Sequence, residues 1–140
     1  AAGNKFPKSG NIFISVNKSD KTKIIKIARD LDEMDYNIMA TKGTAELLIK
    51  NGINCNRIFK VGEGRPNIVD AIKNNEIQMI INTPLGAQSR YDEFEIGKAS
   101  IKYKVPVVTT ISGANAALRA IRIIQNKVLT HHSLQTIFNA

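Results

Sequence analysis

Cysteine is almost absent from this sequence, because Cys55 is the only one in 140 residues. A single thiol cannot form a disulfide within the chain, which is typical of proteins in a reducing compartment, and we therefore expect a cytoplasmic protein. Long apolar runs are missing as well. None approaches the ~20 residues that a membrane-spanning helix needs, and no signal-peptide pattern opens the sequence, so we expect no membrane partner.

Aromatic residues are few, and the eight phenylalanines and tyrosines are not interleaved with basic residues. A surface that stacks on bases needs such interleaving, so we expect no nucleic-acid partner. Acidic residues are in the minority too: 20 lysines and arginines stand against 12 aspartates and glutamates, a net charge of +8. This excess favours anionic partners such as nucleotides, sugar phosphates or an acidic protein surface, although a merely basic solvated surface has the same composition.

Three familiar kinds of site are missing. The sequence has neither a GxGxxG nor a Walker A loop, so no dinucleotide or nucleoside triphosphate is predicted by those loops. His131 and His132 are adjacent and have no cysteine or acid at metal-ligand spacing, so we expect no metal site. Cys55 has no histidine near it in sequence and is interpreted as a bystander, not as a nucleophile.

What the sequence does have is a regular alternation of apolar bursts and helical patterns, over the length of one domain. Strands are predicted at 11–16, 36–41, 57–61, 78–82 and 105–110, and helices at 21–34, 44–50, 68–75, 92–102 and after 112–113. The expected N-caps are Ser19 with Asp20, Thr44, and Ser112. Such alternation predicts a parallel sheet with helices on both faces. We expect residues 1–10 to be a linker and residues 11–140 the domain, and the pattern assigns no structure to residues 128–140.

Open sheets of this class bind ligands beyond the carboxyl ends of their strands. The residues that follow the predicted strands are rich in hydroxyls and amines and poor in acids: Ser15, Asn17, Ser19 and Lys21; Thr41, Lys42, Gly43 and Thr44; Lys60; Asn82 and Thr83; Thr109, Thr110 and Ser112. Helix N-termini at the same edge favour a phosphate, and lysines and hydroxyls can bind its oxygens. Each residue alone could equally be a cap or turn residue, as Gly43 and Thr44 illustrate.

Several motifs are similar to those of the methylglyoxal-synthase-like (MGS-like) domain, and most closely to the C-terminal regulatory domain of the carbamoyl-phosphate synthetase large chain. They are "SVNKSDK", "ATKGTA", "KVGEGRPNI", "INTPLG" and "YKVPVVTT", and the similarity covers residues 11 to about 126. The opening "AAGNKFPKSG" resembles the junction from the preceding synthetase domain. The resemblance implies a three-layer α/β/α fold of Rossmann or flavodoxin type, with a five-stranded parallel sheet in the order 3-2-1-4-5.

The resemblance also implies an allosteric role. Domains of this family bind nucleotide effectors such as UMP and IMP and adjust glutamine-dependent carbamoyl phosphate synthesis, for pyrimidine and arginine formation, elsewhere in the chain. Their effector-binding positions match Ser15, Lys21, Thr41, Thr44, Lys60, Asn82 and Thr83. Thr109 matches a position that contributes to an ornithine site. Pro84 stands where the family often has a threonine, which removes a hydroxyl and an N–H group.

The implied partners are a nucleoside monophosphate, the preceding synthetase domains of the same chain and a small glutaminase subunit. No cofactor is expected in this domain, whereas ATP and Mg²⁺ or Mn²⁺ belong to the parent synthetase domains. The choice between UMP, IMP and phosphoribosyl pyrophosphate stays open, as do the sign of the effect and an interaction role for the tail.

The competing class is an enzyme, a methylglyoxal-synthase-like lyase acting on a triose phosphate. Such an enzyme needs a carboxylate as its general base. The family's acids follow strands three and four, where this sequence has Arg65 and Thr83, and Glu63 is the only acid expected nearby. We therefore predict no catalytic residue in this domain.

Overall fold

The computed structural model describes residues 6–84 and 90–139, with side chains described as far as residue 126. Five strands form one parallel sheet: β1 (Asn11–Ser15), β2 (Asn37–Ala40), β3 (Asn56–Arg57), β4 (Met79–Asn82) and β5 (Val107–Val108). Their order is β3-β2-β1-β4-β5, which confirms the expected order 3-2-1-4-5. The chain order reverses at β1, between β2 and β4, and this is where such sheets bind ligands.

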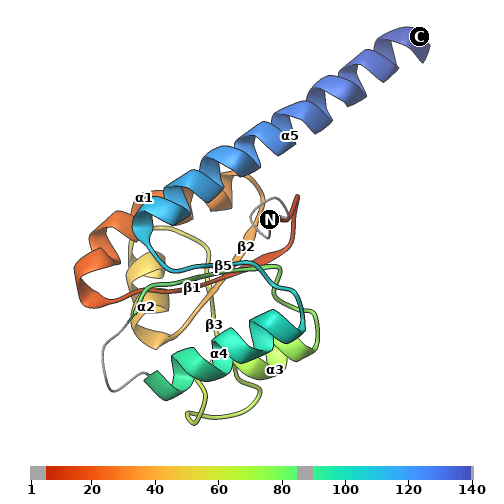
Figure 1. Cartoon of the computed structure of the whole chain (residues 1–140). Helices are drawn as coiled ribbons and strands as arrows, with labels where there is room; N and C mark the ends of the chain where they lie inside the picture. Colours follow the sequence, from red (N-terminus) through yellow and green to blue (C-terminus); the bar gives the residue numbers. More distant parts are fainter. Residues whose placement is uncertain (1–5, 85–89, 140) are drawn as a thin grey trace.

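Helices cover both faces of the sheet (Figure 1). A short 3₁₀ turn, η2 (Lys18–Asp20), precedes α1 (Lys21–Glu33), and the other helices are α2 (Lys42–Lys50), α3 (Ile68–Lys73), α4 (Arg90–Lys102) and α5 (Ile111–Asn139). α1, α2 and α5 share one hydrophobic core with the sheet, and α3 and α4 share the other. The expected three-layer α/β/α architecture is confirmed.

Alternation along the central strands explains the two cores. On β1, Ile12 and Ile14 pack in the α1 core and Phe13 packs in the α3 core, and all three are fully buried. On β4, Ile81 packs in the α1 core and Ile80 packs in the α3 core. Because both faces of a central parallel strand are covered, these strands are continuously apolar until they reach Ser15 and Asn82 at their carboxyl ends. The sheet therefore delivers polar side chains to one edge only where the strands stop.

Two of the expected N-caps were wrong by two or three residues. α2 begins at Lys42 with Thr41 as its N-cap, so Thr44 lies inside the first turn. α1 begins at Lys21 with Asp20 at its N-cap position, as expected, but the Asp20 side chain makes no capping hydrogen bond; Asn17 caps the preceding η2 turn by accepting the Asp20 N–H at 2.9 Å. α5 begins at Ile111, where the Thr110 hydroxyl accepts the Gly113 N–H at 2.9 Å. Thr41 occupies the extended N-cap position of α2, and the Thr110 hydroxyl accepts an N–H group at the start of α5.

Strand and chain ends also differ from expectation. β3 is shorter than 57–61 because Phe59 forms an isolated bridge with Asn67 and does not extend the pairing with β2. α5 continues to residue 139, through most of the tail to which the pattern assigned no structure, and extends away from the sheet (Figure 1). Of the expected linker, residues 1–5 lie outside the described residues. Phe6 packs against the α1 core, and the Tyr36 hydroxyl donates to the Pro7 carbonyl.

Candidate functional site

A small cavity of about 10 Å³ lies at the carboxyl ends of β1 and β4, beside the first turn of α4. Four of the predicted site residues line it: Ser15, Thr41, Lys60 and Asn82. The rest of the lining consists of Phe13, Val61, Ile68, Asp92, Glu93 and Ile96. Its volume is about the space that one water molecule occupies, so a nucleotide needs the side chains around the cavity to move apart.

Buried polar groups on three adjacent strands face this cavity. Ser15 and Thr41 are 3% and 4% exposed, and their hydroxyl oxygens are 3.5 Å apart, at the limit of a hydrogen bond. Asn82 is 8% exposed and lines the cavity, and its carboxamide keeps contact with solvent without a hydrogen bond to a described residue. Hydroxyls and a carboxamide can both donate and accept, so these three side chains suit a polar ligand.

The N-terminus of α2 lies next to the cavity, because its N-cap Thr41 is also a lining residue. Lys21 reaches this first turn: a Cβ added at Gly43 would lie 3.1 Å from the Lys21 Nζ. Thr44 is 3% exposed, and its hydroxyl keeps contact with solvent without a hydrogen bond to a described residue. Free N–H groups, an ammonium and a hydroxyl together suit a phosphate.

Thr83 lies in a different environment from the predicted site residues that line the cavity. It is 1% exposed, and its hydroxyl oxygen accepts the Asn17 N–H at 2.8 Å, while its own N–H donates to the Ser15 carbonyl at 3.0 Å. Thr83 is thus held between the ends of β1 and β4 and does not line the cavity. Since a hydroxyl can donate as well as accept, one hydrogen-bond donor remains on this side chain.

Two acids at the cavity escaped the sequence analysis. Asp92 and Glu93, in the first turn of α4, line it, so Glu63 is not the only acid nearby. Burial raises the pKa of Asp92, and the charges of Glu63 and Glu93 add to this, whereas Lys60 opposes it. The acids were missed because only residues directly after each strand were considered, and Asp92 and Glu93 lie ten and eleven residues beyond the end of β4.

The remaining predicted positions lie away from the cavity. Thr109 is exposed just after β5, and Pro84 is exposed just after Thr83; neither lines the cavity. The side chains of His131 and His132 lie outside the described residues. Within residues 6–84 and 90–126, no group of three metal-binding side chains comes together. Across the described ranges, no helix is both long enough and apolar enough to cross a membrane.

Comparison with protein families shows the family to which this chain belongs. The sequence model of the family described as "MGS-like domain" matches residues 23–109, which include β2, β3, β4 and most of the cavity lining. This chain belongs to the MGS-like domain family. The fold agrees: the crystal structure of methylglyoxal synthase from Elizabethkingia anophelis NUHP1 superposes with a TM-score of 0.63, covering 81% of this chain and 79% of that one. Identity with it is only 14%, so this likeness concerns the fold alone.

Curated relatives of this MGS-like domain are much longer proteins. The "Carbamoyl phosphate synthase large chain, C-terminal section" of Aquifex aeolicus is 42% identical over 99% of this chain and 27% of that protein. The section of the same name from Methanopyrus kandleri is 45% identical, over 98% and 26%. The "Carbamoyl phosphate synthase large chain" of Nostoc sp. is 40% identical, over 96% and 12%. The chain thus spans between about a quarter and an eighth of these relatives.

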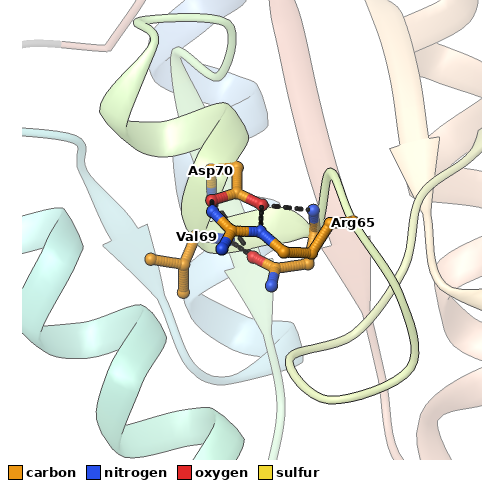
Figure 2. A network of polar contacts seen from close by, with 4 residues as sticks. Arg65, Val69 and Asp70 are labelled. Atoms are coloured by element: carbon orange, nitrogen blue, oxygen red, sulfur yellow. Dashed lines mark hydrogen bonds and ion pairs between the residues drawn. The ribbon is translucent and has the colours of Figure 1, made fainter.

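In this MGS-like domain, the "EGRPNI" motif builds the start of α3 (Figure 2). The Asn67 side chain accepts the Val69 and Asp70 N–H groups, and the Asp70 carboxylate accepts the Asn67 N–H at 2.9 Å. Arg65 pairs with Asp70 at 2.7 Å, its side chain 80% exposed. The Asn67 N–H, followed by Arg65, holds the pKa of Asp70 below its usual range. Arg65 therefore fixes the loop after β3 and does not line the cavity.

Proposed function

We propose that this domain is the regulatory domain of a carbamoyl-phosphate synthase large chain and binds a nucleoside monophosphate. The observation that carries the proposal is the gathering of polar side chains at one sheet edge. Ser15, Thr41 and Asn82 line one cavity and are more than nine-tenths buried, and Lys21 stands at the N-terminus of α2. Relatives named as large chains of this synthase, at 40–45% identity, support the assignment.

The site has both cationic and acidic groups, which suit the two ends of such a ligand. The phosphate is proposed to bind Lys21, Thr41, Thr44 and the first N–H groups of α2, with Lys60 as a second cation. Asp92 and Glu93 also line the cavity, with Lys60 near Asp92, and carboxylates only accept hydrogen bonds when ionised. They suit the hydroxyl groups of a ribose. The Asn82 amide can donate and accept and is proposed, with the remaining donor of Thr83, to bind the base.

Regulation follows from linkage between this site and the rest of a longer protein. The partners proposed are the preceding synthetase domains of the same chain, which bind ATP and Mg²⁺ or Mn²⁺, and through them a small glutaminase subunit. An effector can alter carbamoyl phosphate synthesis only by binding two states of that assembly with different affinity. The domain itself needs no cofactor and no catalytic residue in this proposal.

A ligand panel on the domain tests the binding proposal. UMP, IMP and phosphoribosyl pyrophosphate are compared by thermal shift and titration calorimetry, because a ligand that binds only the native state raises its stability. Uridine, inosine and sulfate are the controls for binding without the phosphate ester. We expect saturable binding of at least one monophosphate and none of its nucleoside. Equal binding of nucleotide and nucleoside, or of none, would contradict the proposal.

The alternative, a triose-phosphate lyase, has one observation in its favour, the Asp92 carboxylate with its raised pKa at the cavity. A general base of this kind is what that reaction needs. Incubation with dihydroxyacetone phosphate should nevertheless give no methylglyoxal above the buffer blank. Product that disappears in Asp92→Asn or Glu63→Gln would identify the base and replace the regulatory proposal with catalysis.

A further inference from the structure

The outer face of α4 carries large apolar side chains that the described part of the chain leaves uncovered. Tyr91, Phe94 and Ile101 are 65%, 64% and 82% exposed. Their spacing places them on one face of the helix, away from Ile96 and Ala99, which pack in the α3 core. Single exposed apolar residues are ordinary, but three on one helix face, two of them aromatic, are typical of a contact between proteins or domains. We call these three side chains the outer stripe of α4.

Gly97 is a second unusual feature of this face. It lies in the middle of α4, three residues after Phe94 and four before Ile101, and its φ is not positive. An added Cβ there would meet nothing within 4 Å, so packing inside the domain does not require glycine. Glycine inside a helix nevertheless costs roughly 0.5–1 kcal/mol relative to alanine. A position without a side chain allows a partner to come close to the helix between the two apolar residues.

The charges beside the outer stripe are mostly of one sign. Three cations of α4 are exposed: Arg90, Lys98 and Lys102. The Lys98 Nζ lies 5.5 Å from the centre of the Phe94 ring. The acids of α4 have other places, since Asp92 and Glu93 line the cavity. Glu95 pairs with Lys98 at 3.6 Å. The rim of the stripe is therefore basic and suits an apolar surface with an acidic rim, whereas a second copy of this chain would bring the same basic rim and a net charge of +8.

We propose that the outer stripe of α4 is the surface by which this domain docks on the synthetase domains of the same chain. The inference rests on the proposed function and deepens it, because it names the surface that links the effector site to those domains. The relatives named as carbamoyl phosphate synthase large chains or their C-terminal sections support this partner, since about three-quarters to seven-eighths of their length lies outside the matched segment.

The position of α4 supports the same partner. Its first turn lines the cavity through Asp92 and Glu93 and also carries Tyr91 of the outer stripe. A cavity of about 10 Å³ has to widen before a nucleotide enters, so a ligand that displaces this turn also displaces the stripe. Docking through the stripe thus gives the two states of the assembly different affinities for the ligand, as regulation requires.

Cysteine labelling compares the docked and the undocked surface. Ile101→Cys is the reporter, and Ile49→Cys is the matched control, because Ile49 is also exposed and is also the last residue but one of its helix, before a lysine. Both are made in the isolated domain and in a large chain that contains the synthetase domains, and iodoacetamide labelling of each peptide is followed by mass spectrometry. Both variants of the domain should melt within about 2 °C of the parent.

In the isolated domain we expect similar labelling rates for the two variants. In the large chain Ile101→Cys should be labelled at least about 10-fold more slowly, as for a contact that is open no more than about a tenth of the time, and Ile49→Cys should keep its rate. An unchanged rate for Ile101→Cys, or equal protection of Ile49→Cys, would overturn the proposal. Protection in the isolated domain that grows with concentration would overturn it too, because a second copy would then cover the stripe.

A charged variant tests the link to the effector. Ile101 does not line the cavity, so Ile101→Glu should leave the affinity of the domain for UMP and IMP unchanged. In the large chain the nucleotide should lose most of its effect on carbamoyl phosphate synthesis in Ile101→Glu and keep it in Ile49→Glu. A full effect in both would overturn the linking role. If the parent binds neither nucleotide, the proposed function fails, while the labelling comparison still decides whether the outer stripe is a docking surface.

Discussion

Two threonines predicted as effector residues should respond in opposite ways to the same substitution. In Thr44→Val, the lost hydroxyl has no hydrogen bond to a described residue, so the folded domain loses no internal interaction. In Thr83→Val, the lost oxygen is the acceptor of the Asn17 N–H at 2.8 Å. Leaving that N–H group without its partner costs about 1–3 kcal/mol of unfolding free energy. Asn17 also caps η2, so the loss spreads into the loop before α1.

These expectations translate into measurable shifts. For a domain of this size, about 1 kcal/mol changes the melting temperature by roughly 3–4 °C, so Thr83→Val should melt about 3–12 °C below the parent. Thr44→Val should melt within about 1–2 °C of the parent or above it, since valine buries well where a hydroxyl has no partner. Its cost should appear in binding. A hydrogen bond to a charged phosphate is worth about 1.5–3 kcal/mol, so nucleotide affinity should fall roughly 10- to 150-fold.

Scanning calorimetry and nucleotide titration on the same preparations make the comparison. Thr22→Val is the matched control, because Thr22 is an exposed threonine of α1 and should change neither quantity. The reasoning is refuted if Thr44→Val destabilises as much as Thr83→Val, or if it binds nucleotide as tightly as the parent. Either result would mean that the Thr44 hydroxyl serves the fold and is not kept for a ligand.

Three further predictions concern single groups. Burial raises the pKa of the Cys55 thiol to about 11, so at pH 8 iodoacetamide should alkylate it on the order of 100-fold more slowly than a free cysteine of pKa ~8.5, and equal rates would contradict its burial. The pKa of Asp70 is lowered in the folded state, so its ionised carboxylate stabilises the fold above the unfolded pKa of ~3.9, and this stabilisation is lost as the pH falls through the folded pKa. The difference in unfolding free energy between the parent and Asp70→Asn should therefore shrink as the pH is lowered. Thr109 lies outside the cavity, so millimolar ornithine should leave its nuclear magnetic resonance signals unshifted in the isolated domain, and Thr109→Val should weaken only the ornithine response of a full-length chain.

The sequence pattern predicted the strands and helices because each has its own period, but not the order of the strands. Order came from the resemblance, since periodicity carries no information on which parallel strands are neighbours. Strand ends were less predictable. β3 stops at Arg57 because Phe59 pairs with Asn67, a contact between segments that no local pattern records.

The candidate site was predicted in part for a similar reason. Polar residues that directly follow apolar strands are visible in sequence, and Ser15, Thr41 and Asn82 were found in this way. Asp92 was not, because it lies on α4, ten residues beyond the end of β4, and does not directly follow a strand. The N-cap of α2 shows the same limit. Thr41 and Thr44 are both suitable caps, and only the extended backbone of Thr41 (φ −75°, ψ 166°) decides between them.

That choice of cap has a functional consequence. Because α2 starts two residues earlier than expected, Gly43 and Thr44 belong to its first turn, and the free N–H groups there stand beside the Lys21 ammonium. If a turn at Gly43 had been followed by a helix from Thr44, the positive end of the helix dipole would lie further along the chain. The Thr44 hydroxyl would then serve as the N-cap. At the observed start that hydroxyl makes no hydrogen bond to a described residue and keeps contact with solvent. In the proposed complex a ligand replaces this solvent, and the same edge of the sheet carries the Ser15, Thr41 and Asn82 groups proposed to lie near the rest of the nucleotide.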